Sequence, residues 1–442
     1  MTRSARPAAW LGPRGIAALF ALAAAAFALA LFVSWPIVAV LAAVAVAGTL
    51  AADVGLVARV PTIVRVLPAR FALARADRIA YTVENDGPVA LRFGVLEAPV
   101  PKLEVAVEGA DGRVPAGGRA TVHIAFTPRE RGRTQIGEAF AWYESPLGFV
   151  RRRIVVGPSA PIRVMPDLSA LERGGDLARR TKLIEAGLRR VRRRGVGTEF
   201  ESLREYAVGD AFRTIDWKAT ARRGKVMVAQ YEVERSQQIV VALDAGRLMA
   251  PRLGDRRKLD YAISAALSIA AIAELSDDRV GLHAFASTTL ASLAPRAGAL
   301  HVAAITDVLT ELQPQREESD YERAALEIRR RFRKRSLIVV FTDLFDPIAS
   351  GAVLAALGLL VPHHLVLVVL MNDAAIAQAL EREPHTVSDA YRAGVAAALV
   401  AERERALALL GRRGIGVIDV PARALSVALL DAYIEIKTRA LL

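Results

Sequence analysis

Two aspartates stand at positions where carboxylates could do chemistry. Asp244 directly follows the apolar run 238–243, and Asp343 lies just beyond the apolar run 337–341. If both runs are parallel strands of one sheet, their carboxyl ends meet at the edge where open α/β sheets bind ligands. Carboxylate oxygens suit Mg²⁺, which takes six oxygen ligands and often keeps water, and a partner protein's carboxylate can fill the last position. The pair therefore indicates either metal-dependent catalysis or a recognition site.

Other catalytic motifs are missing from the sequence. It contains no Gly-x-x-x-x-Gly-Lys-Ser/Thr segment, so nothing predicts nucleotide hydrolysis. It contains no His-Glu-x-x-His segment, and its six histidines are scattered apart from the neighbours His363 and His364. It has no cysteine, which excludes disulfides, thiolate metal sites and cysteine nucleophiles. The two aspartates remain the main candidates for chemistry.

Charged, aromatic and glycine residues are concentrated between positions 194 and 222. Carboxylates such as Glu205 and Asp210 could act as general acids or bases, but arginines and a lysine, Lys218, accompany them. Because buried charges must be paired or hydrogen-bonded, we interpret the segment as a structural ion-pair network that joins it to the sheet that follows. The network comprises Gly195, Gly197, Glu199, Phe200, Leu203, Arg204, Tyr206, Gly209, Asp210, Arg213, Asp216, Trp217, Thr220 and Arg222.

This segment resembles the signature of the domain-of-unknown-function 58 family. The resemblance is carried by a Gly-rich turn, Glu199-Phe200, Leu203-Arg204-Glu205-Tyr206, Gly209-Asp210, Arg213, Ile215-Asp216-Trp217 and Ala219-Thr220-Ala221-Arg222. It implies a bacterial protein with a membrane hairpin, a β domain, the signature and a von Willebrand factor type A-like domain. It also implies a candidate partner, because family members are often encoded beside MoxR-type AAA+ ATPases.

The type A resemblance gives the aspartates a specific context. Type A domains hold a cation at a metal-ion-dependent adhesion site, whose first loop reads Asp-x-Ser-x-Ser. Here the loop Asp244–Leu248 has no serine, and Arg247 places a cation nearby. Ser319 takes the place of the usual threonine, so Asp244, Ser319 and Asp343 form a degenerate site that could bind Mg²⁺ through water. Alternatively, Asp244 and Asp343 pair with Arg247 or hydrogen-bond loop amides, and the site is a vestige or a purely protein-binding surface.

The N-terminal region predicts a membrane anchor. Residues 15–33 carry no charge and, at a rise of about 1.5 Å per residue, form a helix of roughly 28 Å. The run 37–52 forms a second helix of roughly 24 Å. Arginines flank both outer ends, which places both ends and all later domains in the cytoplasm, beside the plasma (inner) membrane. A cleavable signal peptide is the alternative, and the second span argues against it.

The remaining periodicities predict a multi-domain protein. Short alternating runs indicate a β-sandwich, and alternating strands and helices then indicate a mostly parallel sheet covered on both faces. The β runs are 78–83, 91–96, 103–107, 121–126, 139–143 and 154–156. The later strands are 238–243, 280–285, 337–341, 365–370 and 416–420, with an antiparallel edge at 289–293. The helices are 258–275, 300–312, 321–333, 348–359, 387–410 and 425–438.

From these patterns we predict five regions. They are a cytoplasmic basic tail (1–14), a transmembrane hairpin (15–54), a β-sandwich (55–166), a basic linker with the signature (167–235) and a type A-like α/β domain (236–442).

The chain is strongly basic, with a formal net charge of +13, and the excess is uneven. Residues 179–235 hold fifteen Lys/Arg against eight Asp/Glu. The run 179–194 could bind anionic lipid or nucleic acid. It has no aromatic residue to stack on bases, so we favour a solvated segment and do not expect nucleic-acid binding.

Together these observations predict a membrane-anchored, non-enzymatic adaptor without a cofactor. Its type A-like surface would bind a protein, such as a MoxR-type AAA+ ATPase. Two alternatives remain open: a metal-dependent enzyme that uses Asp244 and Asp343, and a membrane-tethered nucleic-acid binder that uses the run 179–194.

Overall fold

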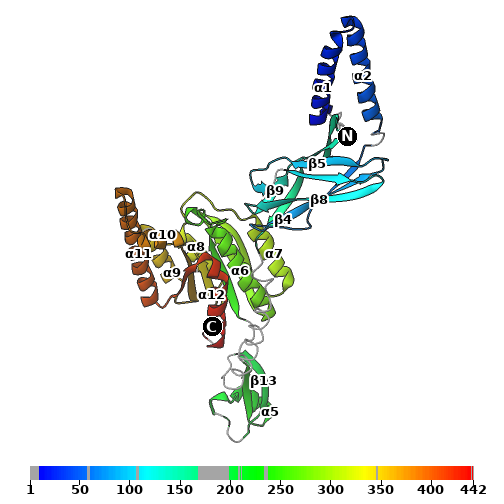
Figure 1. Cartoon of the computed structure of the whole chain (residues 1–442). Helices are drawn as coiled ribbons and strands as arrows, with labels where there is room; N and C mark the ends of the chain where they lie inside the picture. Colours follow the sequence, from blue (N-terminus) through cyan, green and yellow to red (C-terminus); the bar gives the residue numbers. More distant parts are fainter. Residues whose placement is uncertain are drawn as a thin grey trace. The chain divides into compact units, whose positions relative to one another are not determined.

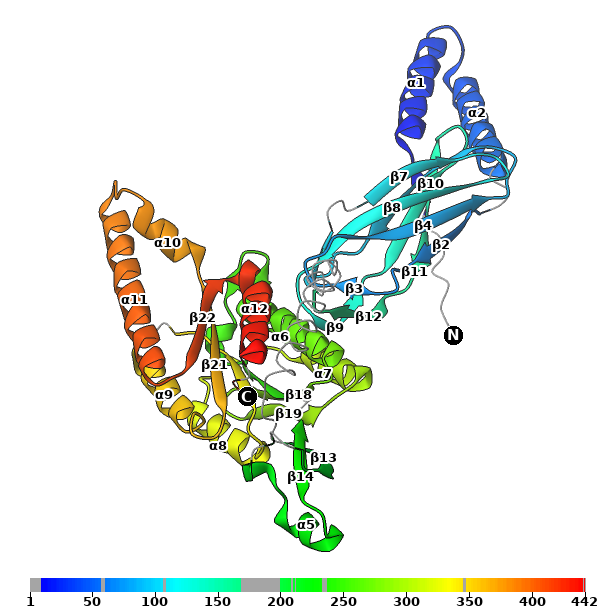
Figure 2. The ribbon, with the colours of Figure 1, turned by 90° about the horizontal axis from the view of Figure 1, so that it is seen from below.

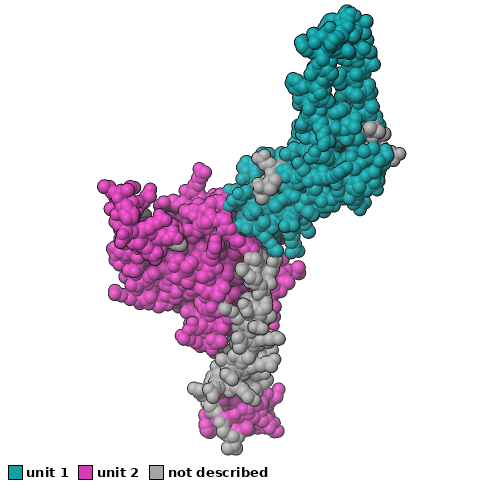
Figure 3. All heavy atoms as spheres, in the orientation of Figure 1, with its two compact units in different colours: residues 1–165 teal, residues 166–442 magenta. Residues whose placement is uncertain are grey.

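The computed structural model divides the chain into two compact units, Met1–Met165 and Pro166–Leu442, which Figure 3 colours teal and magenta. The basic run 179–194, Gly195, Gly197 and Gly209 lie outside the described residues. The structure describes residues 9–56, 60–105, 109–167, 199–207, 210, 212–232, 237–344, 347–439 and 441.

Two apolar helices lie near the start of the first unit, as predicted. Helix α1 spans Pro13–Ala30 and helix α2 spans Trp35–Leu56, and both are long and apolar enough to cross a membrane. They lie side by side in Figure 1. The second helix is longer than the predicted run 37–52. It starts earlier because Pro36 fits a first helical turn, where no backbone N–H is needed.

The rest of the first unit is rich in β-strands, which confirms the prediction at that level. One sheet has the order β1-β11-β10-β5-β7, a second has the order β2-β4-β8-β6, and β3-β12-β9 form a third. Their alternating apolar residues, such as Tyr81 and Phe93, share one buried core. The strands are β1 (Ala9–Leu11), β2 (Thr62–Val66), β3 (Phe71–Ala72), β4 (Asp77–Asn85), β5 (Leu91–Glu97), β6 (Leu103–Val105), β7 (Gly109–Val114), β8 (Gly118–Pro128), β9 (Gly132–Ile136), β10 (Ala139–Glu144), β11 (Val150–Gly157) and β12 (Ala160–Met165).

A six-stranded sheet forms the centre of the second unit. Its order is β19-β18-β15-β20-β21-β22, with β19 antiparallel and the other strands parallel. This confirms the predicted, mostly parallel sheet. The central strands read as continuous apolar runs because both faces of the sheet are covered. The strands are β15 (Gln238–Asp244), β18 (Arg279–Phe285), β19 (Thr289–Arg296), β20 (Leu337–Phe341), β21 (Leu365–Asn372) and β22 (Gly416–Pro421).

Helices cover both faces of this sheet, each over its own buried apolar cluster. One face carries α6 (Lys258–Leu275), α7 (Ala299–Glu311) and α12 (Leu425–Thr438). The other carries α8 (Tyr321–Arg331), α9 (Pro347–Gly358) and the second half of α11 (Val387–Arg412). A further helix, α10 (Ala374–Glu381), packs on α11 and was not predicted from the sequence. Figure 2 shows α10 and α11 beyond the edge strand β22.

Candidate functional site

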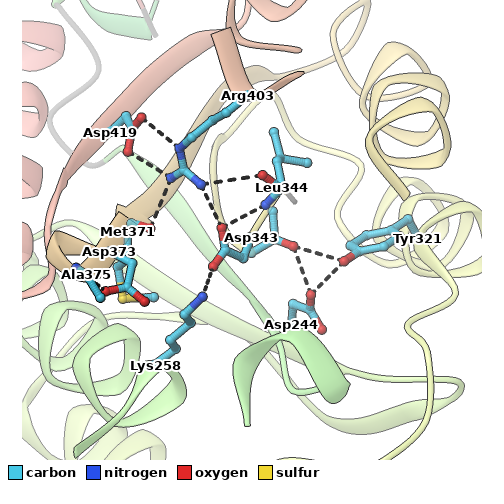
Figure 4. A network of polar contacts seen from close by, with 11 residues as sticks. Asp244, Lys258, Tyr321, Asp343, Leu344, Met371, Asp373, Ala375, Arg403 and Asp419 are labelled. Atoms are coloured by element: carbon cyan, nitrogen blue, oxygen red, sulfur yellow. Dashed lines mark hydrogen bonds and ion pairs between the residues drawn. The ribbon is translucent and has the colours of Figure 1, made fainter. Parts of the chain in front are cut away.

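The two aspartates singled out in the sequence are buried at the carboxyl ends of adjacent parallel strands. Asp244 is the last residue of β15, and Asp343 lies two residues past the end of β20. Both side chains are fully buried, with 0% of their surface exposed. Figure 4 shows them within one polar network. The sheet therefore brings the pair together as the sequence predicts, but it leaves neither carboxylate open to solvent.

Four protein donors surround the carboxylate of Asp244. Its Oδ1 accepts the Gly246 amide at 2.8 Å and the Ser319 hydroxyl. Its Oδ2 accepts the Tyr321 hydroxyl at 2.7 Å and the Thr342 hydroxyl at 2.8 Å. Burial, together with the neighbouring Asp244 charge, raises the pKa of Tyr321, so its hydroxyl remains a proton donor. A carboxylate offers about four lone-pair sites, and these four donors occupy them.

Two cationic side chains neutralise Asp343. The Lys258 ammonium contacts Oδ2, and the Arg403 guanidinium donates to Oδ1 at 3.0 Å. The Leu344 amide adds a third donor at 2.8 Å. Lys258 is 4% exposed and Arg403 is 9% exposed, so these are buried ion pairs. Such pairs are costly to break, because removing one partner leaves an uncompensated charge in the interior.

Arg403 also connects this site to the far edge of the sheet. It reaches both oxygens of Asp419 on β22, at 2.9 and 3.0 Å, and the carbonyl oxygen of Met371 on β21 at 3.0 Å. Burial opposes its charge, but the hydrogen bond to Asp419 and the charge of Asp343 outweigh this and raise the pKa of Arg403. The guanidinium therefore stays charged and fastens α11 to two strands and to the carboxylate of Asp343.

As they stand, the predicted ligands do not fit a Mg²⁺ site. Mg²⁺ requires oxygen ligands with free lone pairs, whereas Asp244 is saturated and Asp343 already faces an ammonium. Gly246 occupies the first serine position of the adhesion-site loop, and a Cβ there would lie 2.1 Å from the Ser319 hydroxyl oxygen. The hydroxyl of Ser319 thus occupies the space of the missing serine. Over the part of the chain that the structure describes, no three His, Asp or Glu side chains are grouped to hold a metal.

Arg247 does not pair with either aspartate, which corrects one sequence-based expectation. Its guanidinium pairs with Glu318 at 2.5 Å, and its backbone amide donates to the Glu317 carbonyl oxygen at 2.8 Å. The physical reason is its position: Arg247 begins a short 3₁₀ turn that carries it onto the surface, where 47% of its side chain is exposed. The backbone amide of Gly246 is the loop group that does bind Asp244.

Sequence reasoning missed four residues of this site: Lys258, Tyr321, Arg403 and Asp419. Lys258 is the first residue of α6, where the helix dipole disfavours a cation, and that anomaly was a usable signal of a buried anionic partner. Arg403 lies on the same face of α11 as the buried Ala396 and Leu410, seven residues away on either side. A charge on a buried helical face was the second usable signal.

The signature segment forms a small antiparallel hairpin with a helix between its strands. Strand β13 (Glu199–Glu205) pairs with β14 (Met227–Glu232), and α5 (Trp217–Arg223) lies between them in sequence. Asp216 caps α5 by accepting the Ala219 amide at 2.9 Å. Thr220 donates to the Asp216 carbonyl oxygen at 2.8 Å and accepts the Met227 amide at 3.0 Å. These residues hold the helix against the hairpin.

Among its described residues, the ion pairs of this segment lie inside it. Arg204 makes a two-pronged pair with Asp210 at 2.5 and 2.7 Å, and Glu205 pairs with Lys225 rather than with a predicted partner. Trp217 is 67% exposed, because as the first residue of α5 it follows the cap and points outward. The predicted link from this segment to the sheet stays a prediction. Leu203 is half-buried, Tyr206 packs on Phe212 and Arg222 is exposed, while the side chains of Glu199, Phe200 and Arg213 lie outside the described residues.

Comparison with known proteins gives one family. The family model described as "Protein of unknown function DUF58" matches residues 202–396, which run from the signature hairpin through every strand of the six-stranded sheet except β22 and end within α11. The crystal structure of the conserved hypothetical protein BatB from Bacteroides thetaiotaomicron is similar at 15% sequence identity, with a TM-score of 0.31. That similarity covers 45% of this chain and 99% of the BatB chain. No curated protein matches the sequence.

Proposed function

We propose that this chain, whose residues 202–396 match the DUF58 family model, is a membrane-anchored, non-enzymatic adaptor. It would present a protein-binding surface, of the von Willebrand type A-like kind, at the carboxyl end of the six-stranded sheet. One observation carries the proposal: the two carboxylates at that end are buried and fully engaged by protein donors.

The state of these carboxylates argues against catalysis. A general acid or base must exchange a proton with a substrate within hydrogen-bond reach, and a metal ligand must offer a free lone pair. Asp244 meets four hydrogen-bond donors, and Asp343 meets two cations and an amide. The network instead fixes the loops that follow β15 and β20. The rim around the network, which comprises Arg247 and the segment 313–320, therefore has a defined shape.

The rim carries exposed charges suited to recognition. Glu317 and Glu318 are exposed in the segment before α8, and Arg247 stands opposite Glu318. With Arg316 and Asp320, also exposed, the segment 313–320 carries three acids and one base, so a basic partner surface complements it. The family resemblance implies a MoxR-type AAA+ ATPase as the partner.

Anchoring gives the adaptor its mechanism. Helices α1 and α2 could hold it in the plasma membrane with both ends cytoplasmic, as the flanking arginines favour. Confinement to the membrane raises the effective concentration of a bound partner near membrane-associated clients. The adaptor then acts by recruitment rather than by chemistry.

Co-purification of the full chain from detergent extracts of native membranes tests this function. The unaltered chain should retain an AAA+ ATPase, and Glu318→Lys should weaken retention because 76% of the Glu318 side chain is exposed at the rim. Glu435→Lys is the matched control, since Glu435 is an exposed acid that also pairs with an arginine, on α12 at the other end of the sheet. It should leave retention unchanged.

Two results would count against the adaptor. One is that neither an AAA+ ATPase nor any other protein is retained by the unaltered chain. The other is stoichiometric Mg²⁺ or Mn²⁺ on the purified chain at millimolar supply, lost on Asp343→Ala, which would favour the metal-dependent enzyme.

A further inference from the structure

One turn of the first unit holds the end of helix α2. Asp53 lies near that end, and its carboxylate is fully buried. It accepts the Ser145 hydroxyl, the Leu147 amide at 2.8 Å and the Phe149 amide at 3.2 Å. All three donors belong to the turn between β10 and β11. An acid near the end of an apolar helix is therefore fixed to a single turn of the β-rich domain.

The same turn holds the start of helix α1. The Gly12 amide donates to the Phe149 carbonyl oxygen at 2.8 Å, and strand β1 pairs with β11 directly beside it. A Cβ on Gly12 would lie 2.5 Å from the Gly148 carbonyl oxygen, and a Cβ on Gly15 would lie 2.4 Å from that of Phe149. Only glycine allows this approach. Both basal ends of the helical hairpin are thus locked to the turn 145–149, rather than joined to it by a loose tether.

Helix length places this turn at the depth of lipid headgroups. Helix α1 has 18 residues and so spans about 27 Å, whereas a bilayer hydrocarbon core is about 30 Å thick. If the hairpin crosses the bilayer, the ends of α1 lie near the two boundaries of the core. The turn 145–149, which touches the base of α1, then lies at one of those boundaries.

The residues around this turn have the composition of a membrane interface. Leu147 is 46% exposed, Trp10 is 43% exposed and Leu11 is 37% exposed, although each is apolar. Trp is enriched at lipid headgroup depth, where its ring is half in water. The side chain of Arg14 lies over Gly148, and Arg14 is exposed.

The charge balance at the turn is positive. The nearest acid of the sheet, Glu144, is already paired with Arg151 at 2.5 Å, and Arg92 lies 3.7 Å from it. Arg14, which is exposed, has no carboxylate partner among the ion pairs of the described residues. An exposed arginine without a carboxylate partner, beside exposed apolar side chains, favours anionic lipid over zwitterionic lipid.

We propose that Trp10, Leu11, Arg14 and Leu147 form a lipid-facing collar, which seats the β-rich domain directly on the headgroup layer of an anionic membrane. The proposal rests on the anchoring part of the proposed function. It adds that the domain is held against the lipid surface in a fixed orientation.

Depth-dependent quenching on the full chain tests the collar. The chain has no cysteine, so Phe32→Cys, Leu147→Cys and Ser159→Cys each give one site for an environment-sensitive fluorophore. Phe32 is 86% exposed at the distal end of the hairpin and reports insertion. Ser159 is exposed beyond the far end of β11, about 26 Å from its start, and is the matched control. The chain is reconstituted in vesicles of equal parts phosphatidylglycerol and phosphatidylcholine, with a spin label on the lipid headgroup or deep in the acyl chain.

We expect the Leu147 probe to be blue-shifted and quenched more strongly by the headgroup label than by the deep label. The Phe32 probe should be quenched, and the Ser159 probe should be quenched by neither label. Quenching at Phe32 without quenching at Leu147 would overturn the collar while leaving the anchor intact. No quenching at Phe32 would instead overturn the anchoring on which the collar depends.

A second arm tests the charge preference. With the spin label carried by phosphatidylglycerol, quenching at Leu147 should exceed that obtained with labelled phosphatidylcholine. Arg14→Gln should lower the preference about fivefold, the factor that corresponds to about 1 kcal/mol per basic residue near an anionic surface. Equal quenching by both lipids in the unaltered chain would overturn the anionic specificity of the collar.

Discussion

The two ends of the six-stranded sheet bury the same pair of side chains in different settings. At the carboxyl end, Asp343 binds Lys258 and Arg403. At the amino end, Asp278 binds Lys437 and the Tyr433 hydroxyl, and its other oxygen accepts the Gln237 amide at 2.9 Å. Both aspartates are fully buried, and both lysines are 4% exposed.

The comparison shows that a buried aspartate–lysine pair can have a purely structural role. Ligands bind open α/β sheets at the carboxyl end, so the pair at the amino end has a structural role, the attachment of α12 to β18. The pair at the carboxyl end has the same chemistry and the same burial. A buried aspartate–lysine pair is therefore no sign of catalysis, even where catalytic sites usually lie.

The two ends of the sheet differ in whether the helix dipole favours the lysine. Lys437 lies in the last turn of α12, where the helix dipole favours a cation, whereas Lys258 begins α6, where the dipole disfavours one. Asp343 must offset that cost, and Arg403 adds a second cation. We therefore expect the carboxyl end to be the more sensitive of the two to loss of its aspartate.

The largest expected effect comes from removing each aspartate. Asp343→Ala and Asp278→Ala should each destabilise the fold by about 3–5 kcal/mol, because each leaves a buried cation without its partner. Asp343→Ala should cost more, since two buried cations lose a carboxylate, although Arg403 keeps its pair with Asp419. Urea unfolding of the full chain in detergent, with hydrogen exchange at β18 and β20, measures both. An Asp343→Ala chain of unchanged stability that fails to retain its partner would break the comparison.

A buried histidine on strand β18 should give the next largest effect on stability. His283 on β18 is fully buried, and neither ring nitrogen has a hydrogen-bond partner among the described residues. Burial lowers the pKa of His283 from 6.5 to about 4. The unfolded chain takes up the proton first, so stability is fully present above pH 6.5 and falls as the pH drops toward 4. The total loss is roughly 3 kcal/mol.

His283→Leu should remove that pH dependence without a loss of stability at neutral pH, because it also removes two unpaired polar atoms. The exposed His385 provides the control, and the loss of stability at low pH should persist in His385→Leu. If the stability of His283→Leu falls between pH 6.5 and 4 as much as that of the unaltered chain, the acid sensitivity does not arise at His283.

The packing of the carboxyl end is tested at Gly246. Gly246→Ala should destabilise the fold by about 1–3 kcal/mol, because the new methyl group meets the Ser319 hydroxyl. Adding Ser319→Gly should recover part of that loss, and a double-mutant cycle measures the coupling. Gly351→Ala is the control, since nothing lies within 4 Å of its added methyl group. Additive effects at 246 and 319 would show that the serine does not fill the loop.

The smallest effect on stability is expected at the surface pairs of the two ends. Arg247→Ala and Arg439→Ala each remove an exposed ion pair and should each change stability by about 0.5 kcal/mol or less. Only Arg247→Ala should alter partner retention, because it belongs to the rim. Equal retention by both variants would remove Arg247 from the proposed binding surface.

The sheet was predictable from the sequence because its patterns are long. The strand 337–341 and the helices 258–275 and 425–438 have the predicted bounds, since apolar runs and helical periodicity mark them clearly. The β-rich region was harder. Strands such as β9 and β7 are short, carry glycine and arginine, and bury few residues, so no apolar alternation identifies them. Helix α10 was also missed, although Asp373 directly before it is a helix N-cap residue.

For the site, the sequence predicted the two aspartates but not their cationic partners. Asp244 and Asp343 follow apolar strands, so topology alone brings them together. Their partners come from distant positions: Lys258 is 85 residues before Asp343, and Arg403 is 60 residues after it. Ion pairing over such separations depends on how helices pack on the sheet, which local patterns do not encode.

The guanidinium of Arg403 attaches helix α11 to the sheet at a point past the middle of the helix. Arg403 ties the helix to Asp343, Asp419 and the backbone of β21, while Val387 and Tyr391 near its start are 89% and 75% exposed. Its first half packs on α10, whereas its second half is fixed to the sheet. A force on the exposed start of α11 produces a torque about Arg403, and a tilt of the helix moves the guanidinium relative to Asp343. A force on the surface of the second unit would thus disturb the buried ion pairs of Arg403.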